Sequence, residues 1–264
     1  MECDLSGRVA LVTGAAQNIG RAISEALAAA GADVVMTWVS PASEALVAEG
    51  CEQIRAVGGK AEPARLDLRE IEGAQQAVRE LLEQKKAIDI VVHNAAIRPR
   101  TQIADVTPAE WHMVLDTNLT GPFFVNQVLI PGMRAQSWGR IIHIGGLDAY
   151  WGNPQRPHVV ASKLGLVGLV RTQANETARW GITVNAVIPG TIDTVRRIAE
   201  WYPEVKDNFA ERVSQIPMGR LGQPSEVGAA CVFLASDHAA YITGQELRVT
   251  GGAYPIIRQP SREY

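Results

Sequence analysis

Short apolar runs alternate along this chain with longer segments in which apolar residues recur every three or four positions. Such runs predict buried strands, and such segments predict amphipathic helices. The strands are expected at Val9–Val12, Asp33–Val39, Ala61–Leu66, Ile88–His93, Gly139–Ile144 and Ile182–Ile188. The first helix has one apolar face, made of Ile19, Ile23, Ala26, Leu27 and Ala30. Alternating strands and helices predict an α/β fold with a parallel sheet covered by helices.

Glycine, proline and capping residues predict where the other helices begin and end. One is expected at Pro41–Val57, because Gly58 and Gly59 follow it, and another at Ile71–Gln84. Thr107 followed by Pro108 predicts an N-cap and the first residue of a further helix.

The loop between the first strand and the first helix, Thr13–Gly20, is the main candidate for binding a ligand. Gly14 permits a tight turn, and Gly20 permits close approach of helix and strand. The free N–H groups and the dipole at the start of the helix favour a pyrophosphate. The predicted cofactor residues of this loop are Gly14, Gln17, Asn18, Ile19 and Gly20.

The tip of the second strand bears on which dinucleotide would bind. An acidic residue there would bind the ribose hydroxyls of NAD, but the chain has Trp38 and Ser40 and neither an acid nor a basic residue. We expect NADP, with NAD as the alternative. Asp67, followed by Leu68, is expected either to cap the next helix or to accept a hydrogen bond from an adenine amino group.

Composition limits the alternatives. The 264 residues suit one domain, residues 1–264, and 47% hydrophobic residues suit a sheet buried on both faces. The net charge of −3 argues against a nucleic-acid or membrane-surface partner. Three widely spaced cysteines, without a metal pattern, a signal peptide or a membrane-spanning apolar run, suggest the cytoplasm.

The motifs together resemble the short-chain dehydrogenase/reductase family. The loop TGAAQNIG resembles TGxxxGxG with Asn18 at the middle glycine, a position that Asn tolerates, and HNAA resembles NNAG. The segment GRLGQPSEVGAACVFLASDHAAYITGQELRVTGG resembles the closing part of the family. The remaining matches are Asn94, Ala95, Asn118, Pro189, Gly190, Ile192 and Thr194. The resemblance implies a Rossmann-type doubly wound sheet of seven parallel strands, a substrate lid at about 191–217, and a homodimer or homotetramer.

The resemblance breaks at the catalytic residues. The family uses a Tyr as proton donor, a Lys four residues later, and a Ser thirteen residues before the Tyr. Lys163 matches the Lys, while Val159 and Gly146 stand at the Tyr and Ser positions. Because a general acid is worth about 10²–10⁴-fold in rate, their loss should disable ordinary carbonyl reduction unless another group replaces them.

Several side chains are candidates for that replacement. The candidate catalytic residues are Asn118, which in the family kinks its helix and holds a relay water, Lys163, Asp148, Tyr150 and His158. Each has an ordinary alternative: His158 as a surface or cap residue, Asp148 as a turn cap, Tyr150 as a pocket wall and Lys163 as a ribose ligand only.

The substrate side contains arginines that suit an anionic small molecule, namely Arg98, Arg100, Arg156, Arg196 and Arg197. Three functions stay open. The first is an NAD(P)-dependent oxidoreductase with a non-standard proton donor. The second is a lyase, isomerase or hydrolase on the same fold, and the third is a catalytically inert dinucleotide-binding protein.

Overall fold

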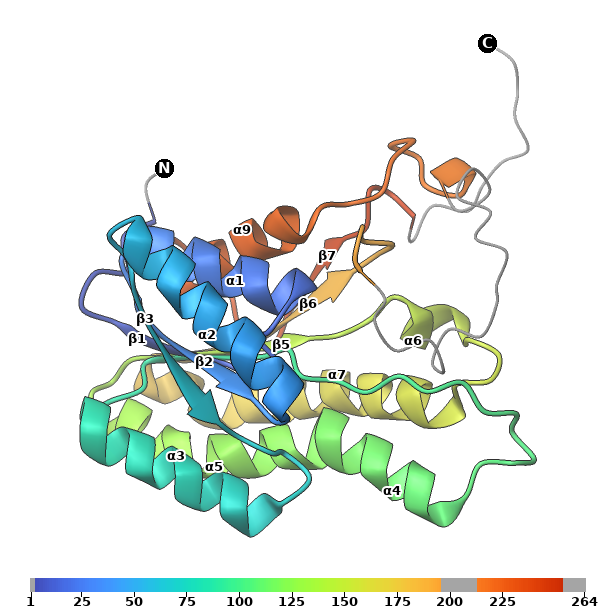
Figure 1. The fold of residues 1–264 in the computed structure, drawn as a ribbon, viewed down its shortest axis with the longest axis horizontal. Coiled ribbons are helices and arrows are strands. Elements are labelled where there is room, and N and C mark those ends of the chain that lie inside the picture. Colours follow the sequence, from blue (N-terminus) through green and yellow to red (C-terminus); the bar gives the residue numbers. More distant parts are fainter. Residues whose placement is uncertain (1–2, 196–212, 254–264) are drawn as a thin grey trace.

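A computed structural model of the chain describes residues 3–195 and 213–253. Seven parallel strands form one sheet in the order β3-β2-β1-β4-β5-β6-β7 (Figure 1). Their bounds are β1 Val9–Val12, β2 Asp33–Trp38, β3 Lys60–Arg65, β4 Ile90–His93, β5 Gly139–Ile144, β6 Ile182–Pro189 and β7 Glu246–Val249. The order reverses between β1 and β4, and ligands of doubly wound sheets bind outside the carboxyl ends of the strands at such a point.

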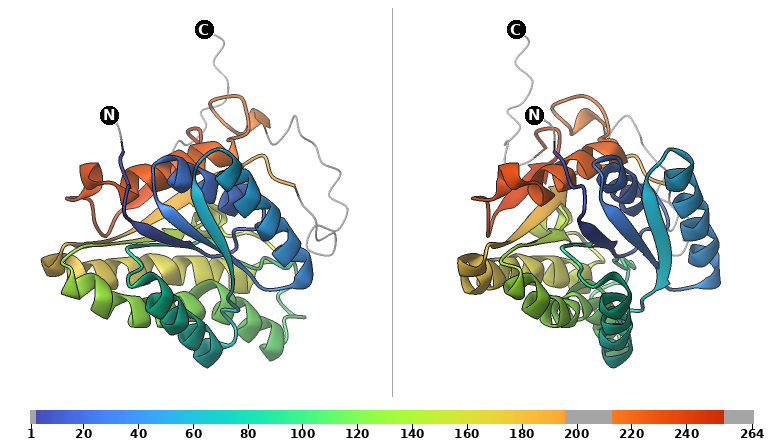
Figure 2. Two further views of the ribbon diagram at one scale, coloured as in Figure 1. Left: turned by 60° about the vertical axis from the view of Figure 1, so that its left-hand side comes forward. Right: turned by 90° about the vertical axis from the view of Figure 1, so that its left-hand side faces the viewer.

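Helices cover both faces of the sheet, as Figures 1 and 2 show. One face carries α1 (Asn18–Ala29), α2 (Pro41–Ala56) and α9 (Pro224–Ala235). The other carries α3 (Ile71–Lys85), α5 (Gly121–Ala135) and α7 (Pro157–Thr177). The connections contain α4 (Pro108–Leu115), a π-helix (Asp116–Thr120), α6 (Asp148–Trp151) and the 3₁₀ turns Ala178–Trp180 and Asp237–Ala239.

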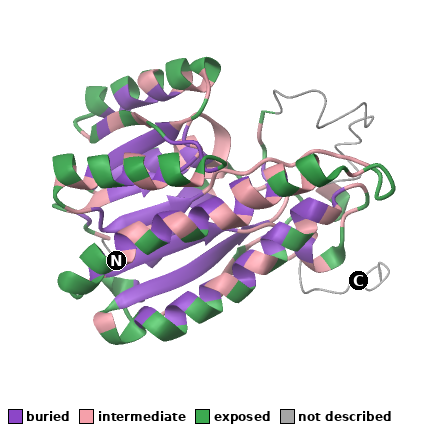
Figure 3. Ribbon diagram, turned by 90° about the horizontal axis from the view of Figure 1, so that it is seen from below, coloured by how far each residue is buried: buried purple, intermediate pink, exposed green. Residues whose placement is uncertain are grey.

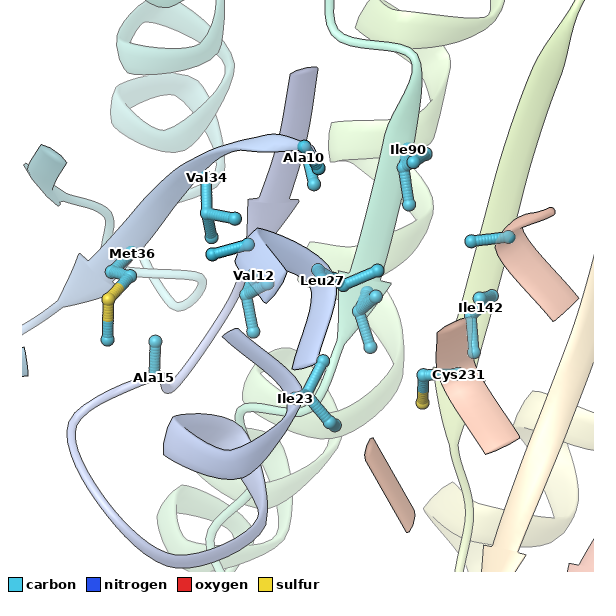
Figure 4. Packing of buried hydrophobic residues seen from close by; sticks show 14 of the residues in the cluster. Ala10, Val12, Ala15, Ile23, Leu27, Val34, Met36, Ile90, Ile142 and Cys231 are labelled. Atoms are coloured by element: carbon cyan, nitrogen blue, oxygen red, sulfur yellow. The ribbon is translucent and has the colours of Figure 1, made fainter. Parts of the chain in front are cut away.

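The core forms two layers because strand side chains point alternately to opposite faces. In β2, Val34 and Met36 pack on the side of α1, whereas Val35 packs on the opposite side. Figure 4 shows Ile23 and Leu27 of α1 reaching toward the strands. The five inner strands, β2, β1, β4, β5 and β6, are buried almost throughout (Figure 3), whereas the edge strands β3 and β7 are partly exposed.

The predicted Rossmann-type architecture is confirmed, with shifts of one or two residues at several ends. The largest shift is in β4, which pairs from Ile90 and not from Ile88. Thr107 caps α4 as predicted, since its hydroxyl accepts from the Glu110 N–H at 3.2 Å.

The expected capping role of Asp67 is wrong. Glu70 occupies the N-cap position of α3, while the Asp67 carboxylate accepts from the Arg69 backbone N–H at 3.0 Å. The carboxylate also binds the Arg69 guanidinium, which is a closer partner than the start of the helix. Among the described residues, no helix is long and apolar enough to cross a membrane.

Candidate functional site

The glycine-bearing loop has the geometry that its residues predict. Gly14 has a φ of +63° and Asn18 a φ of +53°, so both adopt the left-handed conformation. A Cβ on Gly20 would lie 2.2 Å from the Gly14 carbonyl oxygen and 2.6 Å from Nδ2 of Asn94. Only a glycine therefore allows α1 to approach this closely. Asn94 itself donates from Nδ2 to the carbonyl oxygens of Gly14, at 2.9 Å, and Thr13, at 3.1 Å.

The first turn of α1 is open to an anion. Gln17 is its N-cap residue, has an extended backbone and makes no side-chain cap, and the turn contains no acidic residue. The helix then begins at Asn18 and Ile19. Its first N–H groups lack helical acceptors, and the helix dipole adds positive potential there. These features fit a pyrophosphate.

The side chain of Asn18 has a role that the sequence analysis missed. Its Nδ2 donates to the Val195 carbonyl at 2.9 Å, and its Oδ1 accepts from the Val195 N–H at 2.9 Å. The two residues are 177 positions apart, so no local pattern could reveal the contact. It joins the glycine-bearing loop to the segment where the predicted lid begins. Residues 196–212 of that lid, including the sites of Arg196 and Arg197, lie outside the described residues.

The candidate adenosine residues lie at the carboxyl ends of β2 and β3. Trp38 is partly buried against the α1 side of the core. The Ser40 hydroxyl accepts from the Ser43 N–H at 3.3 Å as the N-cap of α2. Hydrogen bonds from Arg69 hold the pKa of the Asp67 carboxyl below its ordinary value, and Leu68 is buried beside it. Asp67 is thus a stable carboxylate that can accept hydrogen bonds.

Asn118 lies in the π-helix between α4 and α5, so the predicted distortion of this helix is present. Its Oδ1 accepts from the Ile97 N–H at 2.9 Å. Its Nδ2 donates to the Ile97 carbonyl at 3.1 Å and lies 3.1 Å from the Ser162 hydroxyl. Asn118 therefore fixes the loop after β4 against α7. The side chain of Ala95 packs against the α7 side of the core.

Lys163 is the central cation of the site. Its Nζ donates to the Ile144 carbonyl at 2.7 Å, and the residue is 7% exposed. Burial, with a smaller contribution from the nearby Arg98 guanidinium, lowers the pKa of Lys163 to about 7. Gly146 lies beside it, since a Cβ there would be 3.9 Å from Cγ of Lys163. Val159, one helical turn before Lys163, is buried.

Two of the candidate replacements are engaged elsewhere. His158 is in the first turn of α7, but the expected surface position is wrong because the side chain is fully buried. Its Nε2 lies 2.7 Å from the Glu110 carboxylate, and its Nδ1 accepts from the Val159 N–H. Tyr150 donates to the Glu246 carboxylate of β7, and burial followed by that carboxylate raises the pKa of Tyr150 to about 12.

Asp148, unlike His158 and Tyr150, binds two arginines. Its carboxylate binds Arg98 at 2.6 Å and Arg156 at 3.2 Å. Arg98 follows β4, Asp148 follows β5, and Nζ of Lys163 binds the carbonyl of Ile144, the last residue of β5, so the three groups lie at the same edge of the sheet.

The loop after β6 completes the region. A Cβ on Gly190 would lie 2.9 Å from Cα of Thr250, so the backbone of this loop runs close to the end of β7. The Pro189 carbonyl accepts from the Leu147 N–H at 3.4 Å, and Ile192 pairs with Gly222 in an isolated bridge. Thr194 follows, partly buried. This loop thus lies at the same sheet edge as Gly146.

A doubly wound parallel sheet with a glycine-bearing loop before α1 defines a protein of the dinucleotide-binding Rossmann class. Residues 14–254 match the family described as enoyl-(acyl carrier protein) reductase. The chain belongs to the short-chain dehydrogenase/reductase family.

The chain aligns with its relatives over nearly the whole length of both proteins. It is 39% identical over 254 residues to the 3-oxoacyl-[acyl-carrier-protein] reductase FabG of Aquifex aeolicus, covering 96% of this chain and 100% of the relative. It is 40% identical to the corresponding reductase of Synechocystis, with coverages of 94% and 97%.

Solved structures of this family have the same fold. A 3-oxoacyl (acyl-carrier-protein) reductase from Agrobacterium tumefaciens with NADP bound has a TM-score of 0.86 at 33% identity, covering 94% of this chain and 95% of that one. A blue fluorescent protein from a metagenomic library in complex with NADPH has a TM-score of 0.85 at 31% identity, with coverages of 95% and 99%.

Proposed function

We propose that this protein is an NADP-dependent oxidoreductase that transfers a hydride to or from a small organic substrate, with Lys163 handling the proton in place of a tyrosine. The observation that carries the proposal is the position of Lys163: buried at the sheet edge, bonded to the Ile144 carbonyl and beside Gly146. Val159 and Gly146, at the positions of the family's Tyr and Ser, have no side-chain proton to give.

The residues present fit the cofactor. Gly14 and Gly20 let the loop pack closely against Ala95 and Asn94, which supports a pyrophosphate at the start of α1, and the tip of β2 lacks an acid that would repel a 2′-phosphate. The NADP and NADPH complexes of similar structures support the same choice. When bound, the dinucleotide supplies or accepts the hydride. Asp67, Asn94, Gly190, Ile192 and Thr194 are proposed to hold it together with the loop.

The mechanism then rests on the ammonium of Lys163. A substrate oxygen that gains negative charge during reduction would receive a proton from Nζ, directly or through one water. Val159 would present an apolar surface to the reacting atoms. Because the pKa of Lys163 is about 7, its protonated fraction falls as the pH rises through 7. Reduction should therefore slow above pH 7, and oxidation should show the opposite dependence.

A fluorescence titration with NADPH and NADH tests the cofactor part, and tighter binding of NADPH is expected. Consumption of NADPH is then followed at 25 °C with acetoacetyl-coenzyme A, because the relatives are 3-oxoacyl reductases, and with imines and activated alkenes. Lys163→Met should lower kcat by about 10²–10⁴-fold. An unchanged kcat in this variant would overturn the role of Lys163, whatever its effect on NADPH affinity.

Two alternative functions are favoured by Val159 and Gly146, because neither side chain can give a proton. The first is a lyase, isomerase or hydrolase, and the second is a catalytically inert dinucleotide-binding protein. Turnover without consumption of NADPH would show the former, and NADPH binding without any turnover would favour the latter.

We also propose a cytoplasmic homodimer or homotetramer. The family commonly forms dimers and tetramers through segments that correspond here to residues 164–174 and 224–234, which are rich in apolar residues. Leu164 on α7 and Phe123 on α5 are exposed. A surface hollow of about 390 Å³ is lined by residues of the π-helix, α5 and α7, namely Leu119, Thr120, Phe123, Gly165 and Leu169. Val227, Cys231 and Leu234 of α9 are already buried within the chain. The α5–α7 surface is thus the better supported half of the proposed interface.

A further inference from the structure

Three charged side chains meet at the carboxyl edge of the sheet, one from the loop after β4 and two from the connection between β5 and α7. Arg98 lies in the loop after β4, Asp148 begins α6, and Arg156 directly precedes α7. Oδ2 of Asp148 accepts from Nη2 of Arg98 at 2.6 Å and from Nη1 of Arg156 at 3.2 Å. One carboxylate thus joins two guanidinium groups.

The exposure of the three side chains is graded. The side chain of Arg156 is 3% exposed, the side chain of Asp148 is 30% exposed, and the side chain of Arg98 is 41% exposed. The buried Arg156 fixes Asp148, and Asp148 in turn fixes the partly exposed Arg98. A guanidinium that is held before a ligand arrives loses less conformational entropy on binding.

The charges leave an excess of positive potential. Arg98 and Arg156 against Asp148 give a net charge of +1, and Lys163 adds to it when protonated. Arg98 is held by Asp148 just after β5, and Lys163 binds the Ile144 carbonyl at the end of β5, so both cations lie at this end of the strand. An anion placed between Arg98 and Lys163 would relieve this repulsion and be bound by both.

The free part of the Arg98 fork can make such contacts. Within the described part of the chain, its hydrogen bonds use Nη2 only. Nε and Nη1 keep donor capacity, and a planar guanidinium fork matches the oxygens of a carboxylate or a phosphate.

We propose that Arg98 is a specificity-determining residue that binds an anionic oxygen group of the substrate, a carboxylate or a phosphate, and holds the reacting carbon near Lys163. Asp148 and Arg156 are positioning residues for Arg98. The inference deepens the proposed function and rests on it for the identity of the reacting cleft.

Binding of small probes to the NADP⁺ complex tests the inference without turnover, because a ketone cannot be reduced by the oxidised cofactor. Acetoacetate is compared with methyl acetoacetate, and dihydroxyacetone phosphate with dihydroxyacetone, by the change in tryptophan fluorescence. At least one anion should bind tenfold or more tightly than its neutral partner. Preference for acetoacetate would identify a carboxylate subsite, and preference for dihydroxyacetone phosphate a phosphate subsite.

Variants assign the effect to Arg98. Arg98→Gln should reduce the preference for the anion to less than threefold, and Arg98→Lys should retain part of it because the charge stays while the fork is lost. Arg79→Gln makes the same change of net charge on the exposed side of α3 and should leave the preference unchanged. NADPH affinity in each variant shows that the protein is folded.

Two outcomes would overturn the inference: equal affinity for anions and neutral partners in the parent protein, or a preference that survives Arg98→Gln. If NADPH itself fails to bind, the proposed function fails separately. The same four probes are then titrated against the protein alone by thermal shift, where a preference for anions that depends on Arg98 would still support the subsite.

Discussion

At the scale of single residues, the empty space beside Lys163 decides what chemistry the cleft can perform. Gly146 has room for a side chain, because a Cβ there meets only Cγ of Lys163, at an ordinary contact distance of 3.9 Å. The double substitution Gly146→Ser with Val159→Tyr should therefore install the missing proton donors and raise kcat/KM for ketone reduction by about 10²–10⁴-fold. Acetoacetyl-coenzyme A and NADPH provide the assay. A variant that binds NADPH but gains no activity would show that the rest of the cleft differs from that of an ordinary reductase.

At the scale of elements, one side chain connects two segments that flank the proposed pyrophosphate site. Asn18 donates to and accepts from the backbone of Val195. Asn18→Gly keeps the left-handed backbone but removes both hydrogen bonds, each worth about 0.5–1.5 kcal/mol. If this energy retains the cofactor, release of NADPH, measured by stopped-flow fluorescence, should become about 5- to 160-fold faster. Asn175→Ala, on the exposed side of α7, is the control and should leave release unchanged. Equal release rates in both variants would remove the proposed link between this contact and the cofactor.

At the scale of the whole molecule, a buried polar cluster connects β4, β5, α5 and α7. The rings of His93 and His143 stack with centroids 4.8 Å apart. The side-chain amide of Asn126 contacts Nε2 of both histidines, and its Nδ2 donates to Oε1 of Gln173. Burial lowers the pKa of His93 to about 4 and that of His143 well below 6.5. After burial, the positive charge that His93 would carry if protonated and the charge of Lys163 lower the pKa of His143 further. Both rings are therefore neutral in the folded protein at neutral pH.

This cluster makes stability depend on pH. The unfolded chain protonates these histidines below about 6.5 and the folded protein does not, so acid favours unfolding. His93 should lower the free energy of unfolding by about 1.4 kcal/mol per pH unit as the pH falls from 6.5 to about 4, and His143 should act in the same direction. Urea unfolding across this range should show a shallower dependence in His93→Asn than in the parent. The exposed His112→Gln should match the parent. The same dependence in all three proteins would contradict the assignment.

Assembly is also a property of the whole molecule. Leu164→Glu places a charge on the exposed apolar surface of α7, where burial against a second copy would be costly. Sedimentation should therefore show a smaller species for this variant than for the parent. Val57→Glu alters another exposed apolar residue and should leave the size unchanged. A parent that sediments as a monomer would contradict the proposed dimer or tetramer.

The sequence determined the fold class and the conformation of the glycine-bearing loop because both depend on local patterns. Apolar runs such as Val9–Val12 specify buried strands by themselves, and Gly14 and Gly20 mark positions where a Cβ would be strained or would collide. It also determined that Val159 and Gly146 are not proton donors, since that follows from residue type alone.

Only the tertiary structure decided which charged groups meet. Asp148 and Tyr150 are two residues apart, yet one binds Arg98 and the other binds Glu246, because the short helix α6 directs them to different neighbours. His158 turns toward Glu110, 48 positions away, and Asn18 reaches Val195. Such contacts depend on how segments that are distant in the sequence pack together, and the local spacing of residues does not specify this packing.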